Sequence, residues 1–268
     1  MKLVAIVRAV TNPEEAARAV ADAAGLTLAE ARMRLAPEPP ALLARLEPGK
    51  ADLLVVALRK AGLAALAVDA RCPSDKDRTV AHAFAIDDAG ITLTPRFGDA
   101  TTFEWTDVLA VLRGARASRS EERRTEKSKS FSIGTAVATG GLKMTRTSTK
   151  TVRSSEEAIE QVILVYARDG RAATLAENEL DFSCLGTGMQ PSSTGNMLEL
   201  ARRLRDGAKS AFYDERLLRL GRRSLPFLAS LESRSQTATT ATTRTDTSSS
   251  LDTLAEVMRQ ALAEGVLP

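Results

Sequence analysis

The feature that most limits the fold is an alternation of short apolar runs and capped helical segments within the first 71 residues. The opening run, KLVAIV, is brief and bounded by charge, which is typical of a buried strand. Asn12 and Pro13 then suit a helix cap and the first helical position. Thr27 and Glu30 stand three positions apart, which is the spacing of a capping box. Two helices therefore follow the first strand.

Prolines divide the same segment. Pro37, Pro39 and Pro40 end the second helix, because proline cannot continue the hydrogen-bond ladder. The following run, ALLARLEPGK, predicts a strand and a turn. An apolar helix then closes at Gly62, and LAALAVDA predicts a last strand. The order is β-α-α-β-α-β, and we expect residues 1–71 to fold as an independent α/β module.

Part of this module is similar to a known domain. Residues 23–69 resemble the C-terminal domain of the bacterial ribosomal stalk protein in GLTLAEA, the proline break, the turn PGK and the run ALRKAG. The resemblance implies a fold that the Clp-protease adaptor ClpS shares. The stalk protein binds translational GTPases through a basic surface on two helices, where this chain offers Arg18, Arg32 and Arg34. The resemblance therefore implies a docking module rather than the ribosomal function.

The pattern changes to strands over residues 72–207. DDAG and Asp169-Gly170 are turn signals between alternating segments, and a capped apolar helix ends this part at Gly207. Strands closed by one helix, together with the segment TTFEWTDVLAV, resemble a bacterial pleckstrin-homology-like domain over residues 78–207. The resemblance implies a β-barrel with a C-terminal helix, so the predicted fold class is α+β.

Three shorter segments complete the predicted plan. Residues 208–232 read as an amphipathic helical segment, and residues 233–250 read as a flexible linker because serine and threonine dominate them. Residues 251–268 are predicted to form a tethered helix. Because an isolated helix of this length is only marginally stable, it should dock, either on its own chain or on another protein. Its predicted partner-binding side chains are apolar: Leu254, Met258 and Leu262.

Positive charge is concentrated in a basic insertion, residues 113–153. It holds eleven Lys/Arg and three Glu, a net of +8, whereas the whole chain has a formal net charge of +3. One interpretation is a solvated loop, with disorder over residues 113–130 and a weakly alternating hairpin over residues 131–152. The other is weak association with anionic lipid or nucleic acid. The predicted anionic-surface contacts are Arg123, Arg124, Lys127 and Lys129.

The glycines of this insertion do not form a phosphate loop. Gly134, Gly140, Gly141 and Lys143 miss the spacing that brings backbone amides and a lysine onto one phosphate. We therefore expect neither nucleotide binding nor another cofactor. One histidine and two distant cysteines cannot supply nitrogen and sulfur ligands for zinc, so no metal site is expected.

One enzymatic alternative stays open. Cys184 lies in a glycine-rich turn near Asp181, and nucleophilic cysteine chemistry needs a base such as His82, the chain's one histidine. This set would make a Cys-dependent hydrolase. The competing interpretation is that the cysteine is a small buried residue, because free cysteine is among the most buried residue types.

The chain shows no convincing signal peptide and no apolar stretch of about 18–20 residues, the length that a membrane-spanning helix needs. Cys72 and Cys184 stand too far apart for a disulfide scaffold, so we expect reduced thiols in the cytoplasm. The sequence predicts a non-enzymatic adaptor or scaffold for a protein partner of unknown identity.

Overall fold

The computed structural model describes residues 1–131, 145–228, 231–236 and 240–268. The chain is mixed α and β and divides into two compact units. The first unit contains residues 1–117, 159–229 and 247–268, and the second contains residues 118–158 and 230–246. The prediction of a mixed helical and sheet protein is confirmed at this level.

The first unit begins with a three-stranded antiparallel sheet in the order β2-β1-β3. Its strands and helices are β1 (Lys2–Ile6), α1 (Pro13–Ala24), α2 (Leu28–Leu35), β2 (Ala41–Leu46), α3 (Pro48–Lys60) and β3 (Ala65–Asp69). The side chain of Asn12 caps α1, and Thr27 with Glu30 forms the capping box of α2. Gly25 ends α1 in the left-handed conformation, with φ of 64°.

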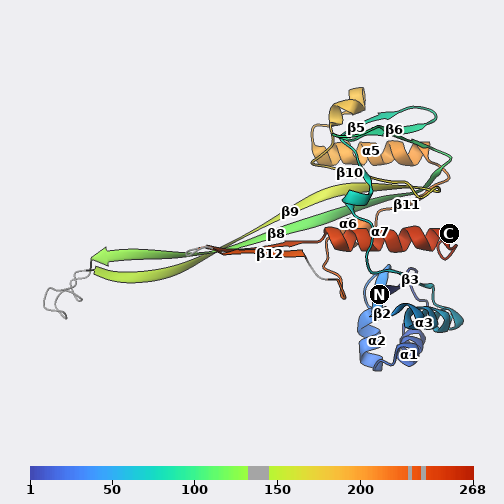
Figure 1. The fold of residues 1–268 in the computed structure, drawn as a ribbon, viewed down its shortest axis with the longest axis horizontal. Helices are drawn as coiled ribbons and strands as arrows, with labels where there is room; N and C mark the ends of the chain where they lie inside the picture. Colours follow the sequence, from blue (N-terminus) through green and yellow to red (C-terminus); the bar gives the residue numbers. More distant parts are fainter. Residues whose placement is uncertain (132–144, 229–230, 237–239) are drawn as a thin grey trace. The chain divides into compact units, whose positions relative to one another are not determined.

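Both faces of this sheet are covered. On one face, Val4, Ile6 and Leu43 pack with apolar side chains of α1 and α3. On the other, Leu3 and Leu66 pack with side chains of the last helix, α7 (Ser248–Ala263). The first 71 residues therefore share a core with the C-terminal helix (Figure 1).

The rest of the first unit is built from strands and one long helix. It contains β4 (Thr79–Val80), β5 (Ala83–Ile86), β6 (Gly90–Thr94), β7 (Thr101–Glu104), the start of β8 (Val108–Phe131), the end of β9 (Thr145–Ala167), β10 (Ala172–Ala176) and α5 (Ser193–Gly207). Strands β5, β6 and β7 form one sheet, whereas β8, β9, β10 and β4 belong to another. The expectation of a barrel is corrected, because none of the described sheets closes: β7 and β8 are not paired, and Met197 and Leu200 of α5 pack in the core shared by the two sheets.

The run QVILVYA of β9 is buried on both faces, which explains its continuous apolar character. Ile163 and Val165 face the core that contains α5. Leu164 and Tyr166 face the opposite way and pack in the core that contains α7. The last helix therefore packs in the core of β8 and β9 as well as in that of the first sheet (Figure 1).

Two expected segments differ from the structure. Residues 208–232 contain a short strand, β11 (Phe212–Asp214), and a helix of four residues, α6 (Leu217–Leu220), in place of a long amphipathic helix. Leu217 and Leu220 are buried in the core with α7, so they serve packing. Residues 233–250 were expected to be a linker, but they include strand residues and the start of α7. Threonine is β-branched and favours strands, so the high content of serine and threonine does not by itself indicate a flexible linker.

The second unit is a set of paired strands. It contains the parts of β8 and β9 between residues 118 and 158, with β12 (Leu231–Gln236) and β13 (Thr240–Asp246). Strand β13 is antiparallel to both β12 and β8. The disorder expected for residues 113–130 of the basic insertion is thus corrected, because their backbone belongs to strand β8. Residues 132–144, including the glycines and Lys143, lie outside the described residues.

Candidate functional site

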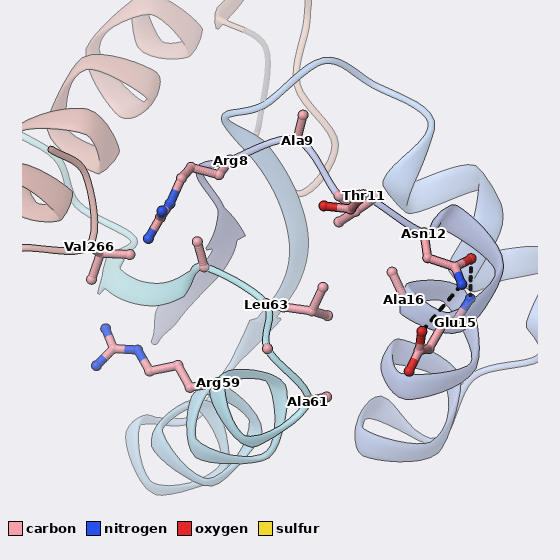
Figure 2. A pocket seen from close by; sticks show the side chains of 13 residues that line it. Arg8, Ala9, Thr11, Asn12, Glu15, Ala16, Arg59, Ala61, Leu63 and Val266 are labelled. Carbon is pink, nitrogen blue, oxygen red and sulfur yellow. Dashed lines mark hydrogen bonds between the residues drawn. The ribbon is translucent and has the colours of Figure 1, made fainter.

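One hollow in the described part of the first unit lies where β1 leaves the sheet and α1 begins. It has a volume of about 600 Å³. Its walls come from the segment after β1, the first turn of α1, the loop between α3 and β3, and the residue Val266 after α7. Figure 2 shows the side chains that line it. We call it the Arg8–Arg59 hollow.

Two arginines form the cationic side of this hollow. The side chains of Arg8 and Arg59 lie on the side where Val266 also lies, as Figure 2 shows. Arg59 donates from Nε to the main-chain oxygen of Ala65 at 2.7 Å and from Nη2 to Glu264 at 2.6 Å. Arg8 is exposed, and no hydrogen bond or ion pair joins its side chain to another residue in the described ranges. The guanidinium of Arg59 is therefore held in place, whereas that of Arg8 can bind a ligand.

The opposite side of the hollow is polar and engaged in helix capping. Asn12 accepts from the backbone nitrogen of Glu15 and donates to its carboxylate, both at 3.3 Å. Between the two sides, Leu63 and Ala61 supply apolar surface (Figure 2). The hollow thus combines a cationic side, an apolar floor and a capped helix start.

These features determine what the hollow can do chemically. Two arginines and Glu15 are the charged lining residues, so their formal charges sum to +1. A guanidinium presents a fork of donors that matches a carboxylate or phosphate and cannot lose its proton near neutral pH. The arrangement is suited to binding an anionic group rather than to transferring protons.

A second polar cluster lies where α7 packs on the strands. Arg78 pairs with Asp252 of α7, and its Nη2 donates to the main-chain oxygen of Pro73 at 2.9 Å. Arg116 pairs with Asp75 at 2.7 Å and with Glu160 at 2.6 Å. We call Asp75, Arg78, Arg116, Glu160 and Asp252 the α7 clamp. The charged groups of the clamp are paired with one another. They therefore hold α7 against the strands and leave few donors or acceptors for a ligand.

Burial dominates the ionisation of groups beside the clamp. It raises the pKa of the Asp252 carboxyl above its usual value, and the attraction of Arg78 opposes this only in part. Burial also raises the pKa of Tyr166, whose hydroxyl has no hydrogen-bond partner among the described residues. The pKa of Cys72 rises to about 11 for the same main reason. Burial therefore makes each of these three groups harder to ionise than it is in water.

The structure places the predicted partner-binding side chains inside the first unit. Leu254 and Met258 have no exposed surface, and Leu262 is half-buried against the same cores. The predicted partner-binding role of Leu254 and Met258 is therefore corrected, because the cores of the chain itself cover both side chains. Of the two docking alternatives, the described residues show docking on the chain itself, because both sheets offer apolar faces that α7 covers.

The four predicted anionic-surface residues lie in β8, in the second unit. The backbones of Arg123 and Arg124 are paired with Ala241 and Thr240 of β13. Lys127 and Lys129 lie further along the same strand. The structure brings these four residues onto one strand, and their association with anionic surfaces stays a prediction.

The residues of the enzymatic alternative have other hydrogen-bond partners. Nδ1 of His82 lies 2.7 Å from the main-chain oxygen of Glu179. The carboxylate of Asp181 accepts from the backbone nitrogen of Ser183 at 2.9 Å. Cys184 is partly buried against the core of α5, and within the described residues no hydrogen bond joins it to His82. The described contacts therefore do not join Cys184, His82 and Asp181 into one hydrogen-bonded set.

In the ranges that the structure describes, no three residues of the types histidine, cysteine, aspartate and glutamate are grouped closely enough to hold a metal ion. Each helix in those ranges falls short of the length and apolar content that crossing a bilayer requires. Comparisons with protein-family models, with curated proteins and with solved structures give no match.

Sequence reasoning missed the Arg8–Arg59 hollow. Arg8 was visible as the charge that interrupts the first apolar run, and Arg59 as a basic residue near the end of an apolar helix. A charge directly after a buried strand is a usable signal, because strand ends lie at the edge of a sheet where ligands often bind. The pairing of these two positions was not readable, since they are 51 residues apart.

Proposed function

We propose that this chain is a non-enzymatic adaptor that binds a protein partner through the Arg8–Arg59 hollow. The observation that carries the proposal is the exposed guanidinium of Arg8, which lines the hollow without a partner among the described residues. Solvated arginines without partners are common on surfaces. This one lies beside a second arginine, above an apolar floor, in a hollow large enough for several atoms of a ligand.

The finer fold assignments support the same proposal. The order of β1, α1, α2, β2, α3 and β3 fits a stalk-protein-like and ClpS-like module. The meander β5-β6-β7, the strands β8 to β10 and the helix α5 follow the order of strands and a final helix in a pleckstrin-homology-like module, although their sheets do not close into a barrel. Both kinds of module serve docking in the families that they resemble, so an adaptor is the function that joins them most economically.

Weak association with anionic surfaces is a separate part of the proposal. It rests on the net charge of +8 over residues 113–153, against +3 for the whole chain. Charge of this density attracts acidic membranes or nucleic acid at low salt and is screened at higher salt. Such an interaction would raise the local concentration of the adaptor without choosing a partner.

The test of the adaptor proposal uses the full chain immobilised on a support. Proteins captured from an extract of the native cells are compared by quantitative mass spectrometry for the wild type, Arg8→Glu and Arg18→Glu. Arg18 is an exposed arginine on α1 outside the hollow, so its variant controls for charge alone. We expect captured proteins that Arg8→Glu loses and Arg18→Glu keeps. Identical sets for all three proteins would contradict the proposal.

A further inference from the structure

We infer that the Arg8–Arg59 hollow binds the C-terminal carboxylate of a peptide whose last side chain is aliphatic. The inference rests on the proposed function of the hollow as a docking site, and it names the chemistry of the ligand. Four features of the hollow lead to it: the arginine pair, the charge balance, the apolar floor and the ion pair between Arg59 and Glu264.

The arginine pair selects an anion with two or more oxygens. A guanidinium forms parallel hydrogen bonds to a carboxylate or a phosphate, and these charge-assisted bonds are stronger than neutral ones. Arg59 is oriented by its bond to Ala65 and by Glu264. Arg8 has donors to spare in the described structure. Together they offer a fixed and a free fork to one incoming group.

The charge balance favours a single negative charge. The lining residues sum to +1, and the carboxylate of Glu264 already takes part of the field of Arg59. A phosphate carries close to two charges at neutral pH and would also meet repulsion from Glu15 on the opposite side. A carboxylate neutralises the hollow without excess charge.

The apolar floor selects what is attached to the carboxylate. Leu63, Ala61 and Val266 line the space next to the arginines, as Figure 2 shows. An aliphatic side chain on the terminal residue would bury its surface there at a gain proportional to the apolar area removed from water. The rest of the peptide can leave through the open side of the hollow, which is a surface feature of the first unit.

The pair between Arg59 and Glu264 makes the ligand a competitor of α7. Glu264 directly follows α7, and the side chains of Glu264 and Arg59 are each 44% exposed. An incoming carboxylate uses the same donors. Removing the Glu264 charge should therefore strengthen binding of the peptide, whereas removing the Arg8 charge should weaken it.

The experiment is calorimetric titration of the full-length protein with acetyl-Ala-Ala-Leu as the free acid. The matched probe is the same tripeptide with a C-terminal amide, and inorganic phosphate is the third ligand. We expect the free acid to bind roughly tenfold to a hundredfold more tightly than the amide, which lacks the charge. Equal affinity of acid and amide, or stronger binding of phosphate than of the acid, would overturn the inference.

Three variants locate the binding. Arg8→Gln should lower the affinity for the free-acid peptide by roughly tenfold or more and leave the affinity for the amide unchanged. Arg18→Gln is the control and should change neither. Glu264→Gln should strengthen binding of the free-acid peptide. Weaker binding of this peptide by the variant would mean that Arg59 does not contact its carboxylate. Arg8 makes no described side-chain bond, so its loss should leave folding intact, which circular dichroism checks.

The outcomes separate this inference from the proposed function. If Arg8→Glu loses captured proteins but the wild type does not distinguish acid from amide, the hollow docks a partner by other chemistry and the ligand assignment is wrong. If neither experiment responds to Arg8, both the docking site and its ligand are wrong.

Discussion

Arg78 and Asp252, 174 positions apart in the chain, form an ion pair in which the arginine side chain keeps no exposed surface. Asp252 lies in the first turns of α7, and Arg78 directly precedes β4. The face of the Tyr166 ring lies 5.8 Å from the guanidinium carbon. The pair therefore fastens the C-terminal helix to the strands at a place where the arginine side chain is covered.

The first prediction concerns this pair. Asp252→Leu should lower the free energy of unfolding by about 3–5 kcal/mol, because it removes the nearer of the two carboxylates that pair with the buried guanidinium of Arg78. The double variant Arg78→Met with Asp252→Leu should recover most of this loss. Urea unfolding of the wild type, both single variants and the double variant measures the coupling. Simple additivity of the two single effects would show that the pair is not coupled.

The second prediction concerns the buried faces of α7. Met258 has no exposed surface and Leu262 is half-buried. Met258→Ala should lower the free energy of unfolding by about 2–5 kcal/mol, since it opens a cavity in the core with β8 and β9. Leu262→Ala is the matched change on the same helix and should cost about half as much or less. Equal small costs would indicate that α7 is not packed between the two cores.

The third prediction concerns the module of residues 1–71. Without α7 its sheet would expose a set of fully or almost fully buried apolar side chains: Leu3, Ala5, Val7, Leu42, Leu66 and Val68. We expect the isolated fragment to self-associate, because apolar patches of this kind are rarely left open on monomers. Analytical ultracentrifugation measures its mass, and addition of a peptide covering residues 247–268 should restore the monomer. A compact monomer without the peptide would restore the expectation of an independent module.

The fourth prediction concerns Cys72. Burial raises the pKa of this thiol from 9.0 to about 11, so below pH 9 its thiolate fraction should be roughly a hundredfold smaller than in the unfolded chain. Iodoacetamide labelling of a Cys184→Ser variant follows Cys72 alone. Its rate should rise with a midpoint near pH 11 in the folded protein and near pH 9 in urea.

The same shift has a consequence for stability. The folded state holds the Cys72 proton more tightly, so this contribution to stability is complete below pH 9 and is lost as the pH rises through about 11. A labelling midpoint near pH 9 in the folded protein would show that the thiol is not buried against α7.

The fifth prediction concerns the basic segment in β8. Replacing Arg123, Arg124, Lys127 and Lys129 with glutamine should abolish sedimentation with acidic liposomes at about 20 mM salt, where screening is weak. Arg8→Gln should leave liposome binding unchanged, because Arg8 lies in the first unit and not in the second. If the wild type does not sediment with acidic liposomes or bind nucleic acid at low salt, the basic residues simply keep the strands solvated.

The sequence by itself determined the local features of the first module. Asn12 and Thr27 cap their helices, and Gly25 ends the first one, as their spacing predicts. Such features depend on contacts between residues three or four positions apart, so they can be read without knowledge of the fold. The continuous apolar run of β9 likewise indicates that both its faces are buried, although it does not say by which elements.

Only the tertiary structure decided what covers each apolar face and which charges meet. The periodicity of α7 revealed an apolar stripe, but not that the helix packs against two cores of its own chain. The hollow that Arg8 and Arg59 both line, and the ion pair of Arg78 with Asp252, bring together positions from distant parts of the sequence. The pattern of side chains along the sequence indicates that a surface must be buried or that a charge must be paired. The partner is chosen by the long-range packing that gives the lowest free energy, and no local spacing records that choice.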